Sequence, residues 1–293
     1  MSTDYSTSDR PTSQVKPVSV KLEQATSLII ERARQLVNQL VEDRGHDKPP
    51  FLSEEYARLL DIKRIEKTDL GEVGAVLLRF HGGYVIKVNQ KHNLARQNFS
   101  CAHEIGHTLL SELRLEPSLE DVEFRTFNPQ AQRIARARAK ERLCDAAATE
   151  LLMPEMVFKK YLSAFGVSIN SIERLANIFR VSVQAAAIRI AEVSAEPCIA
   201  LLWLSRPGNK SKALRLAWHV GPGNKSTGKA NYAPVHTLVR HTSTLYRAYQ
   251  GETLVKSSNL FRFGTATKRC PMESRGFGRE ERRYVISLAF PGR

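Results

Sequence analysis

The 293-residue sequence predicts an α+β protein in which helices come first and strands dominate the last third. Up to residue 196, apolar residues recur mainly at helical spacing. From residue 197 the apolar runs are short, β-rich and separated by loops of Gly, Pro, Asn and Lys. Charge divides the chain at the same point, because residues 197–293 hold 17 of the 44 Lys+Arg residues but only 4 of the 30 Asp+Glu residues. The second part is therefore expected to attract polyanions.

The first elements of the chain are a tail, a helix and a hairpin. Residues 1–22 are rich in Ser and Thr and lack the apolar core of a signal peptide, so they predict a disordered tail. Between residues 27 and 41 the apolar residues have the spacing of an amphipathic helix. Two β-rich runs, 74–80 and 84–89, flank a Gly-Gly pair and indicate a β-hairpin.

Helices occupy most of the following hundred residues. Residues 90–99 lead into a helix that contains 100–110 and stops before Pro117, and further helices are expected at 130–152, 155–165, 171–179 and 182–193. The last two are short and lie two residues apart, which is the outline of a helix-turn-helix. Arg189 is the only cation on the second of them, so we expect this unit to pack or to dock a partner rather than to read DNA bases. Strands are expected at 198–204, 214–220 and 284–290.

The clearest chemical signal is the HExxH pattern that runs from His103 to His107. Residues four apart on a helix are separated by about 40° of arc, so the imidazoles of His103 and His107 can share one ion. The carboxylate of Glu104 lies beside that ion, where it can take a proton from water and pass it to a leaving amine. Gly106 has no side chain and allows another element to approach the helix closely. The pattern points to metal-dependent peptide hydrolysis.

A catalytic zinc usually has three protein ligands, so a third donor is needed. Glu141 on the helix 130–152 fits that role, and Asp145, one turn later, can accept a hydrogen bond from a ligand imidazole. Rival donors are Cys144, Glu150 and Asp121, of which Cys144 is the most serious because thiolates bind zinc well. The ligand types favour zinc, with manganese as the alternative.

Two segments resemble the motifs of the ImmA/IrrE family of bacterial metallopeptidases. They are CAHEIGHTLL at 101–110 and ERLCDAAATELLMP at 141–154. The resemblance implies that His103, His107 and Glu141 hold the metal and that Glu104 is the catalytic acid and base.

The chain departs from the family pattern at three points. Ala147 stands where the family usually has Phe, and Asp145 stands where it usually has Asn. No tyrosine lies between His107 and Glu141, so His81 or an arginine would have to stabilise the oxyanion. These departures are expected to affect the catalytic efficiency of the peptidase more than the type of reaction.

The resemblance also implies a domain order. After the tail we expect an HExxH zincin-like metallopeptidase domain at 23–165, a helix-turn-helix-like domain at 166–196 and a basic GAF-like domain at 197–293. The implied function is site-specific cleavage of a helix-turn-helix repressor, which releases a stress response to DNA damage or radiation. The alternative is a non-enzymatic DNA-binding regulator with a structural metal site. Glu104 favours the enzyme, because a structural site has no need of a general base.

Substrate and partner sites are harder to locate. A substrate chain could add as a strand beside residues 84–89, with Tyr84, Ile86 and Val88 as contacts. In the last third, cations alternate with aromatic residues, as on nucleic-acid-binding surfaces, so non-specific DNA contact through 197–293 is expected unless this is only a solvated basic face. The residues concerned are Arg262, Lys268, Arg269, Arg275, Arg279, Arg282 and Arg283 with Phe261, Phe263, Phe277 and Tyr284. A small-molecule signal pocket is the other possibility for a GAF-like domain.

Two further features bear on where the protein works. The four cysteines are widely spaced and form no CxxC pair, which suits a reducing compartment. The longest apolar runs fall far short of the roughly 20 residues that a membrane span needs. We therefore expect a cytoplasmic protein with no membrane partner.

Overall fold

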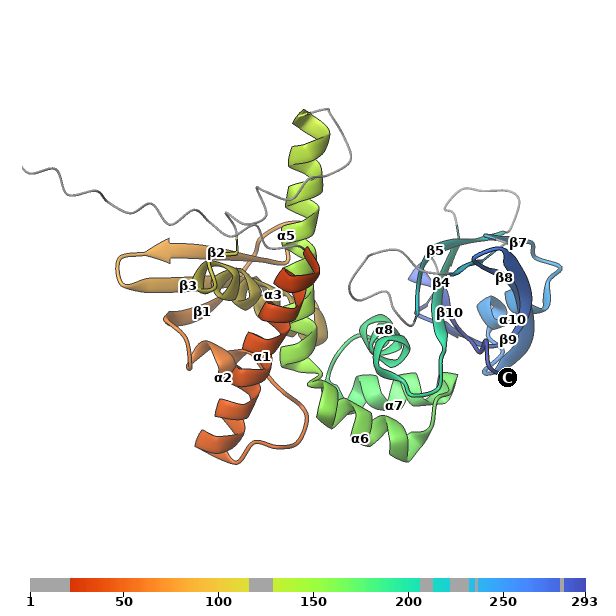
Figure 1. Ribbon diagram of the computed structural model, residues 1–293, viewed down its shortest axis with the longest axis horizontal. Helices are drawn as coiled ribbons and strands as arrows, with labels where there is room; N and C mark the ends of the chain where they lie inside the picture. The colour runs from red at the N-terminus through yellow and green to blue at the C-terminus, as the bar shows by residue number, and fades with distance from the viewer. Residues whose placement is uncertain (1–21, 116–128, 206–212, 222–231, 235–236, 280–281) are drawn as a thin grey trace, which may run out of the picture.

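A small sheet and three long helices make up the first half of the molecule (Figure 1). The computed structural model describes residues 22–115, 129–205, 213–221, 232–234, 237–279 and 282–293. The elements of the first half are α1 (Leu22–Arg44), α2 (Ser53–Ala57), β1 (Ile62–Thr68), β2 (Ala75–Phe80), β3 (Gly83–Asn89), α3 (Leu94–Glu112) and α5 (Pro129–Leu152). The expected tail at 1–22 lies outside the described residues except for Leu22.

The three-stranded sheet has the order β1-β3-β2. β3 is therefore the central strand, parallel to β1 and antiparallel to β2. β2 pairs only with β3 among the described strands, so its other edge is open.

Helix α3 carries the HExxH pattern and begins at Leu94, where the side chain of the N-cap residue Asn93 accepts a hydrogen bond from the backbone N–H of Arg96 at 2.9 Å. Ile105, Leu109 and Leu110 on this helix are fully buried. This burial turns the polar side of the helix toward the space between β2 and α5.

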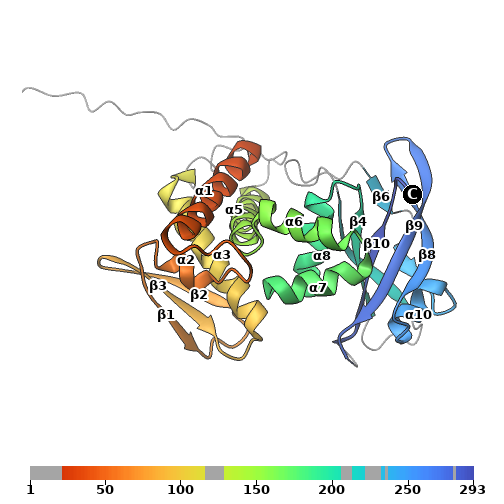
Figure 2. The same cartoon turned by 90° about the horizontal axis from the view of Figure 1, so that it is seen from below.

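Three shorter helices follow α5 and connect it to the last third. They are α6 (Glu155–Phe165), α7 (Ile169–Phe179) and α8 (Val183–Val193). Ser168 and Ser182 cap α7 and α8 by accepting hydrogen bonds from the backbone, as serines at this position commonly do. Both views show these helices between α5 and the C-terminal sheet (Figures 1 and 2).

The last third forms a seven-stranded antiparallel sheet with the order β6-β8-β9-β10-β4-β5-β7. Its elements are β4 (Ile199–Ser205), β5 (Leu214–Val220), β6 (Tyr232–Pro234), β7 (Leu238–Val239), α10 (Thr244–Gln250), β8 (Val255–Phe263), β9 (Ala266–Phe277) and β10 (Tyr284–Ala289). Helix α10 covers one face, and α8 packs against the other through β4, β5 and β10.

Strand β4 is buried on both faces, which explains its continuous apolar sequence. Ala200 and Leu202 belong to the large core that runs from α1 through α8, whereas Leu201 and Trp203 belong to a separate core under α10. One hydrophobic core therefore continues from the first half of the molecule into one face of the C-terminal sheet.

The α+β class is confirmed. The sequence analysis missed α2, β1, α10 and the β6 to β9 strands, which are short or carry many polar residues. The GAF-like assignment and the proposed domain limits remain predictions. Among the described helices, none is both long enough and apolar enough to cross a membrane.

Candidate metal centre

Helices α3 and α5 touch at Gly106. A Cβ atom at this position would lie 2.8 Å from the Cα of Cys144, closer than such atoms approach in folded proteins. The two backbones therefore approach as closely as the sequence analysis expected of a glycine here. Because of this contact, His103 and His107 on α3 face Glu141 and Asp145 on α5.

The Nε2 atoms of both histidines point to the same carboxylate. His103 Nε2 lies 3.0 Å from Glu141 Oε2, and His107 Nε2 lies 3.8 Å from Glu141 Oε1. The imidazole side chains are largely buried, while that of Glu141 is 55% exposed. Two imidazole nitrogens and one carboxylate oxygen are a donor set that suits a catalytic zinc or manganese ion.

The other nitrogen of His103 is held by Asp145. Nδ1 lies 2.9 Å from Asp145 Oδ1, and because an ionised carboxylate only accepts hydrogen bonds, Nδ1 carries the proton. This tautomer leaves Nε2 of His103 available for a metal. Burial alone would lower the pKa of His103, but the hydrogen bond and charge of Asp145 outweigh it, and the pKa is raised. The structure thus gives Asp145 the contact expected for it.

Cys144 is the competing third ligand. Its Sγ and the ring nitrogens of His103 and His107 form a group whose ligand atoms lie within 4.8 Å of one another. However, Sγ lies 3.3 Å from Nδ1 of His107, on the opposite side of the ring from Glu141. Burial also raises the pKa of the Cys144 thiol well above its usual range, which favours the neutral form. The Nε2 atoms of both histidines thus face Glu141, whereas Cys144 contacts the other ring nitrogen of His107.

Of the two remaining rivals, only Glu150 lies in the described part of the chain, and its carboxylate is bonded elsewhere. Glu150 is buried in an ion pair with Arg189, whose Nη2 lies 2.6 Å from Glu150 Oε2. It also accepts a hydrogen bond from Arg34 Nε at 3.2 Å. Asp121 lies outside the described residues.

Glu104 lies where a general base is needed. Its carboxylate accepts a hydrogen bond from the backbone N–H of Leu77 on the edge strand β2. Burial is the main reason that its pKa is raised, although the neighbouring His103 and this hydrogen bond oppose the shift. A carboxylate with a raised pKa holds a proton more readily, which suits a group that shuttles one.

Glu104 and His107 open onto a cleft of about 430 Å³ between β2, α3 and α5. Its lining residues are Ala75, Val76, Leu77, Arg79, Tyr84, Glu104, His107, Ser111 and Lys140. Lys140, Arg79 and Ser111 were missed by the sequence analysis, since nothing in their local pattern marks them. The only available signal was that Lys140 directly precedes Glu141 in the sequence.

The expected strand addition at residues 84–89 is wrong. Both edges of β3 are already paired, with β1 and with β2, so no further chain can bond there. Ile86 and Val88 are also wrong as substrate contacts, because their side chains are buried in the core. Tyr84 does line the cleft, and the open edge beside the site belongs to β2.

The structure limits which residues could contact nucleic acid. Arg189 is 2% exposed and donates to Glu150 and to the Met153 carbonyl, so it cannot contact DNA. In the C-terminal sheet, Phe261 and Phe277 are buried and offer no surface on which a base could stack. Arg275 forms an ion pair with Glu173, in which Nη1 of Arg275 lies 2.8 Å from Oε2 of Glu173.

The part of the chain that holds this site is similar to known proteins. Residues 62–191 match the family model described as the IrrE N-terminal-like domain. The radiation response metalloprotease IrrE of Deinococcus radiodurans is 32% identical over 115 residues, which are 39% of this chain and 33% of that protein. The protein of the same name from Deinococcus deserti is 33% identical over 124 residues, 42% of each chain. The matched region thus spans less than half of either relative.

One solved structure resembles the whole fold. A Mycobacterium tuberculosis transcriptional regulator superposes with a TM-score of 0.57 at 13% identity, covering 92% of this chain and 82% of that one. At this identity the likeness concerns the fold alone.

Proposed function

We propose that this protein is a metal-dependent endopeptidase that cuts one particular protein substrate, because residues 62–191 match the IrrE N-terminal-like domain and two metalloproteases are similar to part of the chain. The observation that carries the proposal is the convergence of His103 Nε2, His107 Nε2 and Glu141 beside the Glu104 carboxylate. A structural metal site would not need a half-buried carboxylate facing an open cleft.

A divalent metal held by His103, His107 and Glu141 would supply Lewis-acid chemistry, polarising a peptide carbonyl and acidifying water. Zinc fits this donor set best, and manganese is the alternative. Asp145 fixes the tautomer of His103, and Cys144 contacts the far side of His107. These two contacts hold both imidazoles in the orientation that the ligand set requires.

Glu104 acts as the proton carrier in this proposal. It accepts a proton from the attacking water and returns it to the leaving amine. Its hydrogen bond to the Leu77 N–H keeps the carboxylate at the open edge of β2. Tyr84 and Lys140 line the same cleft and are the candidates to stabilise the negative charge on the carbonyl oxygen. Tyr84 would supply the phenol that is missing between His107 and Glu141.

The substrate chain would lie along β2. Leu77 directs its N–H away from β3, so the outer edge of β2 offers backbone groups to an extended chain. Pairing with β2 would fix the direction and the register of the substrate chain, so that one peptide bond lies beside Glu104. It takes the place of the strand addition expected at 84–89.

We propose that the substrate is a helix-turn-helix repressor and that its cleavage releases a stress response. The names of the Deinococcus relatives support a role in the response to radiation. The competing hypothesis, a DNA-binding regulator with a structural metal, receives no support from α8, since the helix is covered by the C-terminal sheet and its cation is buried.

The test is direct. Repressors encoded in the same genome would be incubated with the protein loaded with zinc or manganese, and the products would be identified by mass spectrometry. We expect one repressor to be cut at a single peptide bond, with no product when a chelator is present. Intact repressors under all metal conditions would refute the proposed function.

A further inference from the structure

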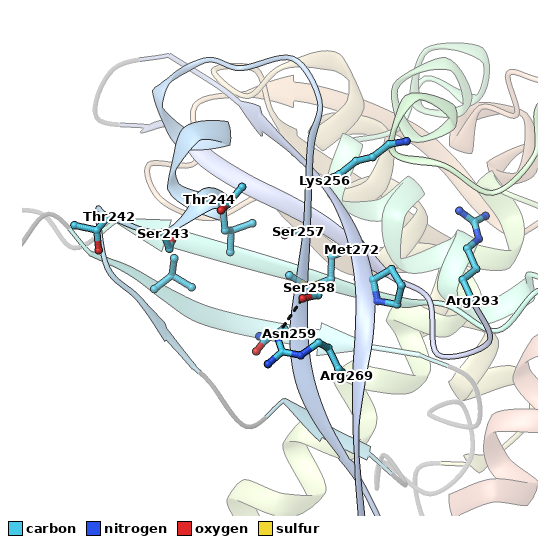
Figure 3. Close-up of a pocket in the computed structure, with 13 residues that line it drawn as sticks. Thr242, Ser243, Thr244, Lys256, Ser257, Ser258, Asn259, Arg269, Met272 and Arg293 are labelled. Atoms are coloured by element: carbon cyan, nitrogen blue, oxygen red, sulfur yellow. Dashed lines mark hydrogen bonds between the residues drawn. The ribbon is translucent and has the colours of Figure 1, made fainter.

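The C-terminal sheet carries a cleft of its own, apart from the metal centre. It has a volume of about 890 Å³ and lies between the segment that follows β7 and the strands β8 and β9 (Figure 3). The lining residues are Val239, Thr242, Ser243, Thr244, Leu245, Lys256, Ser257, Ser258, Asn259, Arg269, Pro271, Met272 and Arg293. Pockets for small ligands usually have volumes of roughly 300–1,000 Å³, so this one can hold a compact molecule.

The cleft exists because the sheet curls without closing. β6 and β7 are the two ends of the strand order, yet only residues 235–237 separate them in sequence. β6 pairs with β8 only at 261–263, so within the described residues no strand pairs with the outer edge of β8 at 255–260. Val239 of β7 lines the same space as this open edge.

The lining is rich in hydrogen-bond donors and has no carboxylate among the described residues. Five residues carry hydroxyls, one carries an amide and three are cationic. The hydroxyl oxygen of Ser257 is buried and has no hydrogen-bond partner within the described structure. The donors that are open to the cleft are therefore those of the other lining residues.

Of the three cations, Arg269 is the one placed to bind a ligand. Arg293 is already bonded to both carboxylate oxygens of Glu196, at 2.6 and 3.0 Å. In Figure 3, Arg293 and Lys256 extend away from the wall formed by Thr242 and its neighbours. Arg269 instead reaches across to Asn259 and donates to Ser258 Oγ at 3.1 Å. This hydrogen bond uses one of the five donors of a guanidinium.

Within the described residues, no ion pair joins Arg269 to a carboxylate. Residues 197–293 contain four acidic residues, of which Glu252 and Glu273 lie in the described part. Glu252 bonds to Arg247 at 2.7 Å, and Glu273 accepts a hydrogen bond from the backbone of Ile169 and lies 3.8 Å from Arg293. The cleft therefore has a positive potential that favours an anion.

We propose that this cleft binds a small phosphorylated molecule through Arg269, with the hydroxyls of Ser243 and Ser258 and the amide of Asn259 as further donors. An arginine fork matches the oxygens of a phosphate or a carboxylate. The surrounding donors outnumber what the two oxygens of a carboxylate can use, whereas a phosphate group presents three terminal oxygens. The proposal is independent of the peptidase function.

The test uses the full-length protein with inorganic phosphate, adenosine monophosphate and adenosine as probes. Binding of each probe would be measured by calorimetry. The midpoint of thermal unfolding would also be measured with each probe and compared with the midpoint in chloride at the same ionic strength. We expect saturable binding of at least one phosphate-bearing probe and none of adenosine. The Arg269→Gln variant should bind that probe about tenfold more weakly or worse, as expected when a charged hydrogen bond is removed.

The matched control is Arg262→Gln, which removes an exposed arginine from β8 outside the cleft and should bind like the native protein. Binding of phosphate alone would identify a free phosphate ion as the ligand, and binding of adenosine monophosphate alone would identify a nucleotide. Either outcome supports the site. The proposal is overturned if adenosine binds as well as its phosphate, if no probe saturates, or if both variants lose affinity equally. It is also overturned if Arg269→Gln weakens only binding to duplex DNA.

Discussion

At the residue scale, the metal centre depends on which ring nitrogen faces which partner. Both Nε2 atoms face Glu141, while the Nδ1 atoms of His103 and His107 face Asp145 and Cys144. Each imidazole thus has one nitrogen for a metal and one for the protein. This division separates the ligand role of Glu141 from the supporting role of Cys144.

The first prediction concerns Glu104. The Glu104→Gln variant should keep its metal and lose activity by about 10² or more, since only proton transfer is removed. Metal content and cleavage of the substrate would be measured on the same preparation. Glu112→Gln is the matched control, because Glu112 lies on the same helix but pairs with Arg32 at 2.9 Å. Normal cleavage by Glu104→Gln would remove the general-base assignment.

The second prediction compares the two candidate third ligands. Glu141→Gln should lower metal affinity by about tenfold or more, because it removes a charged ligand. Cys144→Ala should change affinity little, because its sulfur faces Nδ1 of His107. Metal content after dialysis against a graded chelator would separate the two. A loss of metal that followed Cys144 instead would make the thiol the ligand.

At the element scale, the site depends on how closely α3 approaches α5. Gly106 permits this approach, and Cys144 is its neighbour on the other helix. Alanine is the better helix former by roughly 1 kcal/mol, but its Cβ would meet backbone atoms that cannot move away. The clash should therefore outweigh the gain in helix propensity.

The third prediction follows from this close approach. Gly106→Ala should lower the free energy of unfolding by about 1–3 kcal/mol, as overpacking does, and should weaken metal binding. Chemical denaturation and metal titration would measure the two effects. Gly292→Ala is the control, since nothing lies within 4 Å of a Cβ at that position. An unchanged metal affinity in Gly106→Ala would show that the helices can separate without disturbing the ligands.

Helix α8 joins the first half of the molecule through a buried ion pair. Arg189 and Glu150 are each 2% exposed, and Glu150 also accepts hydrogen bonds from Arg34 and from the backbone N–H of Glu155. These interactions connect α8 with α5, α1 and the start of α6. The cation that stood out in the helix-turn-helix sequence is therefore a structural residue.

The fourth prediction tests this role. Arg189→Ala should lower the free energy of unfolding by about 3 kcal/mol or more, because it leaves the Glu150 carboxylate buried without its partner. Its affinity for DNA should not change. Arg180→Ala is the control, since Arg180 is an exposed arginine in the turn before α8. Lower DNA affinity in a folded Arg189→Ala protein would contradict the structural assignment.

At the scale of the whole molecule, the parts are not independent. Ala200, Leu202 and Ile286 of the C-terminal sheet belong to the same core as the helices α1 to α8. Deleting residues 197–293 would expose that core, so a truncated chain cannot separate a role of the basic domain from a loss of stability. Charge is better tested by surface substitutions in the full chain.

The fifth prediction concerns binding to DNA. If the basic surface binds phosphates, neutralising exposed Arg262, Arg279 and Arg282 to Gln should weaken binding to any duplex. The slope of log affinity against log salt should become shallower by about 0.9 for each phosphate that the variant no longer neutralises. Fluorescence anisotropy with two unrelated duplexes at several salt concentrations would measure it.

The control removes the same number of charges from another part of the chain, at the exposed residues Lys63, Arg64 and Lys67 of β1. This variant should bind DNA like the native protein. If both triple variants lost affinity for DNA equally, the net charge of the protein would determine binding and the basic surface of the C-terminal sheet would have no special role. Binding that differed between the two duplexes would contradict a sequence-independent interaction.

Features that depend on local spacing could be predicted from the amino-acid sequence alone. Helical periodicity placed His103 and His107 on one side of a helix, and the apolar run at 198–204 indicated a buried strand. A glycine between the two histidines indicated a close helix packing, which the structure contains. These inferences succeed because neighbours in sequence are neighbours on an element.

Features that depend on pairing between distant segments became visible only in the folded molecule. Strand order made β2 rather than β3 the open edge, and helix packing buried Arg189 and brought Tyr84 and Lys140 into the cleft. It likewise separated Glu141 from Cys144, which lie within one turn of each other on α5 but face opposite sides of His107. Such arrangements are set by interactions between residues far apart in the chain, so the local spacing of residues does not predict them.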